Sequence, residues 1–149
     1  MKRKLITGLL ITLILIAFSA CSNGSNSSSG GNGTVPVLTK AFITNVQPTS
    51  ENLNTCPQLS QVNQNQTYYF VVDFYDPDMD VCNFQYSFYN FNTSHDIFTR
   101  TINQQYEYQF NYIDDFGNFA NSGSANVSVY VTDNKGNKSN TLSISFTIQ

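Results

Sequence analysis

The chain has 149 residues, with 7 Lys and Arg against 10 Asp and Glu and a formal net charge of −3. Three of the basic residues stand at positions 2 to 4, and without them the balance is 4 − 10 = −6. This charge argues against nucleic acid as a partner, because Lys and Arg must neutralise phosphates, and against a polybasic membrane contact.

The N-terminus has the pattern of a secretory signal peptide over residues 1–20. Basic residues at positions 2 to 4 precede an apolar run from Leu5 to Phe18, and the small pair Ser19-Ala20 follows. Cys21 comes directly after it. Together these residues resemble the signal of bacterial lipoproteins, although Phe18 stands where Leu is usual.

The resemblance implies that the thiol of Cys21 carries a diacylglycerol and holds the protein on membrane lipid, since each buried methylene contributes about 0.8 kcal/mol. It implies a cell-envelope location, and the outer membrane or cell surface is expected rather than the inner membrane. Ser22 in place of Asp leaves outer-membrane sorting open. Two alternatives stay open. Residues 5–20 could remain as an anchor, although 16 residues fall short of the roughly 20 that span a bilayer. Ordinary cleavage would instead leave Cys21 a bystander thiol.

Residues 22–34 contain only Ser, Asn, Gly and Thr and bury no apolar surface. With Cys21 they predict a flexible linker over 21–34, with an rms reach of about 20 Å. The remaining residues, 35–149, suit one small domain.

Apolar and polar residues alternate along most of that domain, as in Val127, Val129 and Val131, and no stretch keeps a helical period. This pattern predicts half-buried strands and no long helix. The expected strands are 38–47, 66–75, 82–90, 96–102, 105–113, 124–133 and 140–149. Short strands separated by turn formers predict an all-β antiparallel sandwich.

The closing segment, residues 127–148, contains the turn Val-Thr-Asp-x-x-Gly-Asn-x-Ser. It resembles the last two strands of bacterial immunoglobulin-like domains of the PKD-like and cadherin-like kind, and residues 69–80 resemble their second strand and following loop. The resemblance implies an immunoglobulin-like β-sandwich of about seven strands. Such modules are mostly spacers, cell-adhesion units or partner-binding domains. The chain has no Trp, so it lacks the core tryptophan of antibody domains.

Two further cysteines, Cys56 and Cys82, form an even pair if Cys21 carries lipid. In an oxidising compartment they predict a disulfide that closes a 26-residue loop, with about 3–3.5 kcal/mol of stabilisation. The alternative is two free buried thiols. One histidine and two thiols at these spacings do not form a zinc site.

Asp76, Asp78 and Asp80 place carboxylates on alternate residues of one expected loop. Calcium takes six to eight oxygen ligands, so the loop is a candidate Ca²⁺ site. In immunoglobulin-like folds the loop before the last strand shares this end, which brings Asp133 and Asn134 toward the cluster. The alternative is a solvated acidic turn.

Tyr and Phe number 21 in this chain. Tyr69, Tyr75, Tyr89 and Tyr130 alternate away from the expected core and are candidates for a binding face, since tyrosine gives contact area at low entropic cost. The alternative is an outer face that merely tolerates tyrosine. Residues 106, 108, 110 and 112 share one parity, which predicts an aromatic core face for their strand.

Catalytic signals are weak. His95 is the only histidine, no hydrolase or phosphate-loop motif is present, and Asp114-Asp115 read as turn formers. The sequence therefore predicts a non-enzymatic lipoprotein domain that binds a protein or glycan at the cell envelope. A calcium-stabilised structural spacer is the alternative, and an enzyme is the third.

Overall fold

The computed structural model describes residues 33–90 and 96–149. The predictions for the signal peptide, Cys21, nearly all of the linker and His95 fall outside these residues. Within them, no helix is long and apolar enough to cross a membrane. The ordered elements are β1 (Val37–Thr44), β2 (Gln61–Val62), β3 (Thr67–Tyr75), β4 (Val81–Asn90), β5 (Asp96–Thr101), β6 (Tyr108–Gly117), β7 (Gly123–Asp133) and β8 (Leu142–Ile148).

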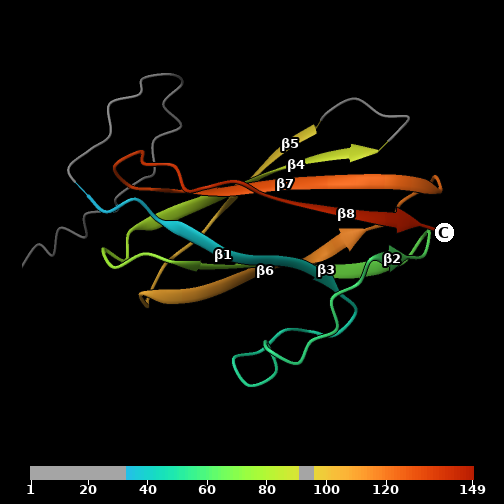
Figure 1. Cartoon of the computed structure of the whole chain (residues 1–149), viewed down its shortest axis with the longest axis horizontal. Helices are drawn as coiled ribbons and strands as arrows, with labels where there is room; N and C mark the ends of the chain where they lie inside the picture. Colours follow the sequence, from blue (N-terminus) through green and yellow to red (C-terminus); the bar gives the residue numbers. More distant parts are fainter. Residues whose placement is uncertain (1–32, 91–95) are drawn as a thin grey trace, which may run out of the picture.

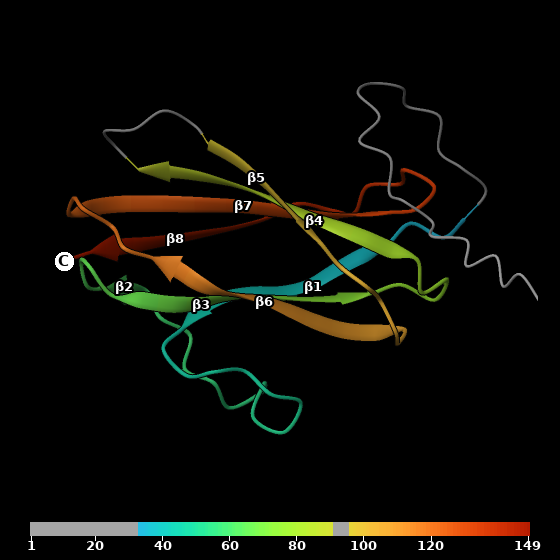
Figure 2. The same cartoon turned by 180° about the vertical axis from the view of Figure 1, so that it is seen from behind.

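The strands form two sheets that face each other, as Figures 1 and 2 show. One sheet has the order β1-β3-β6 and the other the order β2-β8-β7-β4-β5. All pairings are antiparallel except that of β2 with β8. Immunoglobulin-like domains place strands A, B and E in one sheet and C, F and G in the other. The strands β1, β3 and β6 and the strands β4, β7 and β8 reproduce that order, so the predicted immunoglobulin-like β-sandwich is confirmed.

The core lies between the sheets and consists mainly of aromatic rings and valines. Phe70 of β3 is fully buried, and its ring centroid lies 5.8 Å from that of Tyr86 in β4 and 5.2 Å from that of Phe116 in β6. The alternating valines of β7 are all 0% exposed. A period of two along each strand therefore delivers one face to the core, as expected for half-buried strands.

The predicted Cys56–Cys82 disulfide is wrong, because the thiol of Cys56 is free. Cys56 is buried with Phe42 and Val71 in a small cluster beneath the loop of residues 45–60. Cys82 belongs to β4 in the other sheet, where its Sγ lies 3.5 Å from the carbonyl oxygen of Thr132. Cys56 lies on the outer face of the three-stranded sheet, away from the other sheet that contains Cys82, so the two residues do not reach the Cβ separation of about 3.8 Å that a disulfide requires.

Candidate functional site

Three loops meet at the end of the sandwich where β1 begins (Figures 1 and 2). They are the β3–β4 loop (76–80), the β5–β6 loop (102–107) and the β7–β8 loop (134–141). The backbone N–H of Asn134 donates to the carbonyl oxygen of Asp80 at 2.9 Å, and that of Asp76 donates to Glu107 at 2.8 Å. The expectation that the β7–β8 loop approaches the acidic cluster is thereby confirmed.

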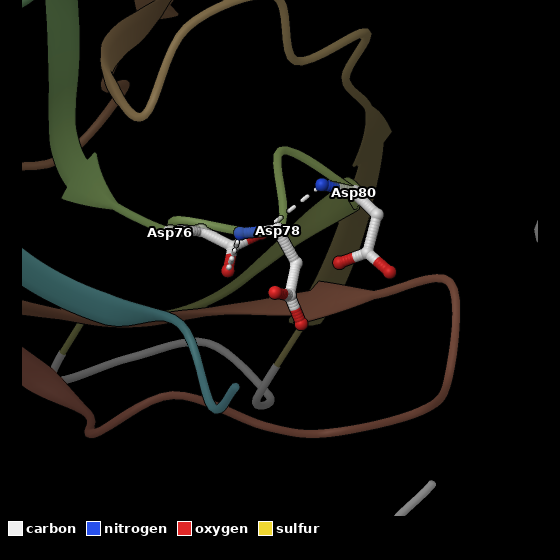
Figure 3. Close-up of side chains that lie close together, drawn as sticks. All are labelled: Asp76, Asp78 and Asp80. Atoms are coloured by element: carbon white, nitrogen blue, oxygen red, sulfur yellow. Dashed lines mark hydrogen bonds between the residues drawn. The ribbon is translucent and has the colours of Figure 1, made fainter. Parts of the chain in front are cut away.

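Asp76 stabilises the β3–β4 loop (76–80), the acidic loop, through hydrogen bonds from the loop's own backbone. Its side chain is fully buried, and its two carboxylate oxygens accept the backbone N–H groups of Asp78 at 3.4 Å and Asp80 at 3.1 Å (Figure 3). Burial raises the pKa of Asp76 above its ordinary value. The fold thus brings one carboxylate oxygen from each of the three aspartates within 4.8 Å of the others.

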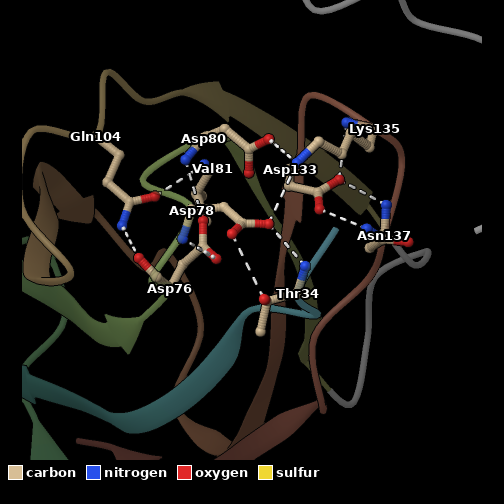
Figure 4. Close-up of polar contacts among 9 residues, drawn as sticks. All are labelled: Thr34, Asp76, Asp78, Asp80, Val81, Gln104, Asp133, Lys135 and Asn137. Atoms are coloured by element: carbon tan, nitrogen blue, oxygen red, sulfur yellow. Dashed lines mark hydrogen bonds and ion pairs between the residues drawn. The ribbon is translucent and has the colours of Figure 1, made fainter. Parts of the chain in front are cut away.

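Lys135 of the β7–β8 loop supplies a positive charge to this cluster (Figure 4). Its Nζ lies 3.2 Å from Oδ2 of Asp78 and 3.2 Å from Oδ2 of Asp80. These contacts raise the pKa of Lys135. The backbone N–H of Thr34 donates to Asp78 at 2.7 Å and, together with Lys135, lowers the pKa of that carboxyl. The start of the domain is therefore attached to the acidic loop.

Asp133 does not join the three clustered aspartates. Its Oδ1 accepts the backbone N–H groups of Asn137 at 2.7 Å and Lys135 at 2.9 Å, and its Oδ2 accepts the side-chain amide of Asn137 at 2.7 Å (Figure 4). Asp133 thus holds its own hairpin turn, in which Gly136 has a φ of 85°. Among the described residues, Oδ1 of Asp80 is buried without a hydrogen-bond partner.

Gln104 connects the acidic loop to the β5–β6 loop. Its Oε1 accepts the N–H of Val81 at 2.8 Å, and its Nε2 donates to the carbonyl oxygens of Asp76 at 3.0 Å and Tyr106 at 2.8 Å. The side chain is 9% exposed. Nothing in the sequence distinguishes it from the neighbouring Gln105, so sequence reasoning missed it.

Beside the two loops that Gln104 connects, the outer face of the β1-β3-β6 sheet contains a groove of about 600 Å³. The 45–60 loop forms one wall, the β5–β6 loop forms the other, and outward side chains of β3 and β6 form the floor. The lining residues are mostly amides and aromatic rings: Ser50, Leu53, Asn54, Asp73, Asn103, Gln105, Tyr106, Tyr108, Gln109 and Phe110. Burial raises the pKa of Asp73 on the floor.

The most exposed tyrosines belong to this groove and not to the predicted set. Tyr106 is 66% and Tyr108 69% exposed, and the Tyr108 ring lies over that of Tyr75 with centroids 4.4 Å apart. The predicted aromatic core face of residues 106–112 is wrong, because Tyr108, Phe110 and Tyr112 share the outer face with Tyr75. The core side of β6 is instead formed by Ile113 and Phe116.

The four predicted binding tyrosines are divided between the two sheets. Tyr69 and Tyr75 lie on β3, whereas Tyr89 and Tyr130 lie on β4 and β7. Tyr69 packs edge to face on Tyr112, at 5.7 Å, in the cluster that contains Cys56. The hydroxyl of Tyr130 donates to Gln85, and Lys138 Nζ lies 3.6 Å above its ring. Only Tyr75 therefore belongs to the groove region.

A second recess of about 500 Å³ lies where the two sheets separate at β5 and β6. Aromatic side chains dominate its lining, and an exposed ion pair, Arg100 to Asp115 at 3.0 Å, lies at its edge. Phe116 and Phe119, which line it, are also core residues. Asp114 and Asp115 lie in β6, so the expected turn at this position is wrong.

No family model matches the chain, and no curated protein matches it. A solved structure that resembles it is the crystal structure of a Niemann-Pick type C2 protein from the Japanese carpenter ant. The identity is 11%, the match covers 81% of this chain and 98% of that chain, and the TM-score is 0.49. The assignment to the immunoglobulin-like sandwiches rests on the strand order. The groove of about 600 Å³ beside the acidic loop, with its aromatic and amide lining, is the candidate binding site.

Proposed function

We propose that the protein is a lipid-anchored, non-catalytic binding module of a bacterial cell envelope. Cys21 carries the lipid, the Ser/Gly/Asn linker keeps the sandwich close to the membrane, and the groove on the β1-β3-β6 sheet takes the ligand. The proposal is supported by the combination of a lipoprotein-type signal with a single small β-sandwich.

The observation that carries the binding role is the groove itself. Its volume of about 600 Å³ lies within the range of ligand sites, and it combines aromatic surface with several polar groups that fix orientation. The non-catalytic role is supported by the absence of hydrolase motifs from the sequence.

The anchor is tested by metabolic labelling with a palmitate analogue in a bacterial host. We expect the full chain to be labelled and to sediment with membranes, and Cys21→Ser to lose the label and become soluble. A Cys21→Ser variant that stays membrane-bound overturns the anchor.

The binding role is tested with a photo-crosslinking residue placed at position 106 in intact cells, and at position 141 as a matched exposed control. Position 106 lies on the groove wall, and Thr141 is exposed in the β7–β8 loop away from the groove. We expect a discrete crosslinked product at 106 alone. Equal products at both positions, or none, overturn a groove-based function.

A second function, calcium-stabilised spacing, is supported by the acidic loop. Calcium prefers oxygen ligands, and Asp80 presents a buried Oδ1 without a hydrogen-bond partner among the described residues, near Asp76 and Asp78. Lys135 competes for the same oxygens. Millimolar CaCl₂ should therefore raise Tm, more strongly in Lys135→Gln and not in Asp80→Asn. An equal rise in Asp80→Asn excludes this site.

A further inference from the structure

The chemistry of the groove points to one class of ligand. Of its ten lining residues, Asp73 is the only one that is charged at neutral pH, and the register pairs it with Lys40 of β1. The two opposite charges leave the floor close to neutral. An anionic ligand such as a phosphorylated or sulfated molecule finds no cationic side chain among the lining residues.

The rings provide a flat apolar surface that faces solvent. Tyr108 stacks on Tyr75 at 4.4 Å with an interplanar angle of 34°, and 69% of Tyr108 remains exposed. A pyranose ring presents a patch of C–H groups on one face, and such a patch packs on the face of an aromatic ring, whose charge distribution is negative there. Tyr106, 66% exposed, provides a second ring on the same wall.

Three side-chain amides in the lining have, in the described part of the chain, no hydrogen-bond partner that a ligand would have to replace. Within the described residues, the side-chain amides of Asn54, Asn103 and Gln105 make no hydrogen bond, so each offers a donor pair and an acceptor. Gln109 holds the wall in place, since its Oε1 accepts the N–H of Gln105 at 2.7 Å and its Nε2 donates to the carbonyl of Asn103 at 3.2 Å. Amides and one carboxylate match hydroxyl groups, which both donate and accept.

A peptide ligand fits less well. Peptides add to open sheet edges or place apolar anchors in deep pockets. The floor of this groove is a sheet face, from which backbone N–H and C=O groups do not project, although β6, which contributes Tyr108, Gln109 and Phe110 to the lining, is an edge strand. Leu53 and Phe110 are the only aliphatic or phenyl side chains in the lining.

We propose that the groove binds a neutral oligosaccharide, with Tyr108 as the stacking platform and Asn54, Asn103, Gln105 and Asp73 as the groups that bind its hydroxyls. This inference rests on the proposed binding function and names its ligand class.

The test uses the full chain, expressed in a bacterial host and extracted in detergent. It is applied to an array of neutral hexose and N-acetylhexosamine oligosaccharides, with uronic-acid and sulfated counterparts. We expect binding to neutral members only, weakened about tenfold by Tyr108→Ala and little changed by Tyr108→Phe. Tyr89→Ala, on the other sheet, is the matched control and should bind as wild type.

Because Tyr108→Ala also removes a ring contact with Tyr75, Asn103→Ala and Gln105→Ala serve as independent variants at exposed positions. Each should weaken binding about fivefold, in line with one lost hydrogen bond, at unchanged Tm. Neutral-glycan binding that persists in all three variants overturns the groove as its site. Preference for the anionic members overturns the ligand class.

Panning a displayed random-peptide library against the same protein distinguishes a failure of the glycan proposal from a failure of the proposed binding function. Peptides whose binding is lost in Tyr108→Ala, together with a blank neutral array, would overturn the glycan and keep the groove as a binding site. No groove-dependent ligand in either format would overturn the binding function as well.

Discussion

Gln104 holds two loops together through three hydrogen bonds to backbone groups of Val81, Asp76 and Tyr106. Each of these groups would lose a partner if the amide were removed. Because an unsatisfied buried group costs about 1–3 kcal/mol, one side chain stabilises the end of the sandwich that carries both the acidic loop and the groove.

Replacement of Gln104 with Ala is predicted to lower the free energy of unfolding by about 2 kcal/mol. Gln105→Ala, at an exposed position, should change it by less than about 0.5 kcal/mol. Urea denaturation followed by fluorescence measures both. Equal effects of the two substitutions would contradict the role of Gln104.

The aspartates of the acidic loop make the stability of the fold depend on pH in the acidic range. The folded-state pKa of Asp78 lies below its ordinary value of 3.8, because the N–H of Thr34 and the ammonium of Lys135 favour the carboxylate. Its contribution to stability is therefore complete above about pH 4 and is lost as the pH falls through the folded-state value. Asp76 has the opposite sign, since burial raises its pKa and its ionisation opposes folding as the pH rises through this range.

Asp78→Asn is accordingly predicted to lower Tm at neutral pH and to reduce the difference from wild type in strong acid. Thermal unfolding across the acidic range checks this, with Asp114→Asn as an exposed-aspartate control. A constant difference from wild type at every pH would show that the charge of Asp78 does not matter.

At the scale of elements, two glycines with positive φ border β6 and β7, and they differ in their surroundings. Gly117 has a φ of +145°, and a Cβ there would lie 2.2 Å from the carbonyl oxygen of Gln66. Gly123 has a φ of +135°, and a Cβ there would meet no heavy atom within 4 Å. Backbone strain is therefore common to both positions, whereas the steric clash belongs to Gly117.

Gly123→Ala is predicted to cost about 1–3 kcal/mol, which is the strain of this backbone region. Gly117→Ala should cost more than about 3 kcal/mol, because β6 must also move away from residue 66. Chemical denaturation of the pair gives the comparison. If the two substitutions lower the free energy of unfolding equally, the close contact of Gly117 with the carbonyl oxygen of Gln66 does not contribute to stability.

The strands were predictable because the alternation of apolar and polar residues along the sequence indicates which face of each strand is buried. Seven expected strands correspond to β1 and β3 to β8, and β2 was missed because two residues carry no periodicity. For β6, which extends to Gly117, Asp114-Asp115 looked like a turn. The register of β6 with β3 shifts at these two residues, and pairing resumes at Phe116, whose ring is buried. That burial is a tertiary effect that local sequence does not show.

The site was predictable only in part, for the same reason. The gathering of Asp76, Asp78 and Asp80 followed from their spacing, but Lys135 came to them from the β7–β8 loop. The error over Cys56 has a similar cause. Counting cysteines gave a pair, whereas the 45–60 loop buries Cys56 against the outer face of the three-stranded sheet.

At the scale of the whole molecule, the two sheets share one core of interlocking rings. Phe70 contacts Tyr86 across the interface and Phe116 within its own sheet. The sheets should therefore unfold together, since neither retains a buried face without the other.

Phe70→Ala is predicted to lower the free energy of unfolding by about 3–5 kcal/mol and to affect both sheets equally. Hydrogen exchange of β3 and β7 amides, measured with Tyr106→Ala as an exposed aromatic control, tests this. Loss of protection in β3 alone would show that the sheets are separate cooperative units.

The hydrogen bond from Thr34 to Asp78 fixes where the chain enters the sandwich, and the β5–β6 loop with Tyr106 lies at that same end, opposite the C-terminus (Figure 1). If Cys21 carries lipid, as we propose, this end would lie within the linker's expected reach of about 20 Å from the bilayer. A ligand held between the 45–60 loop and the β5–β6 loop would then come from the protein's own cell envelope. An anchored groove of this kind favours binding to wall or capsule material of the same cell over adhesion to neighbouring cells.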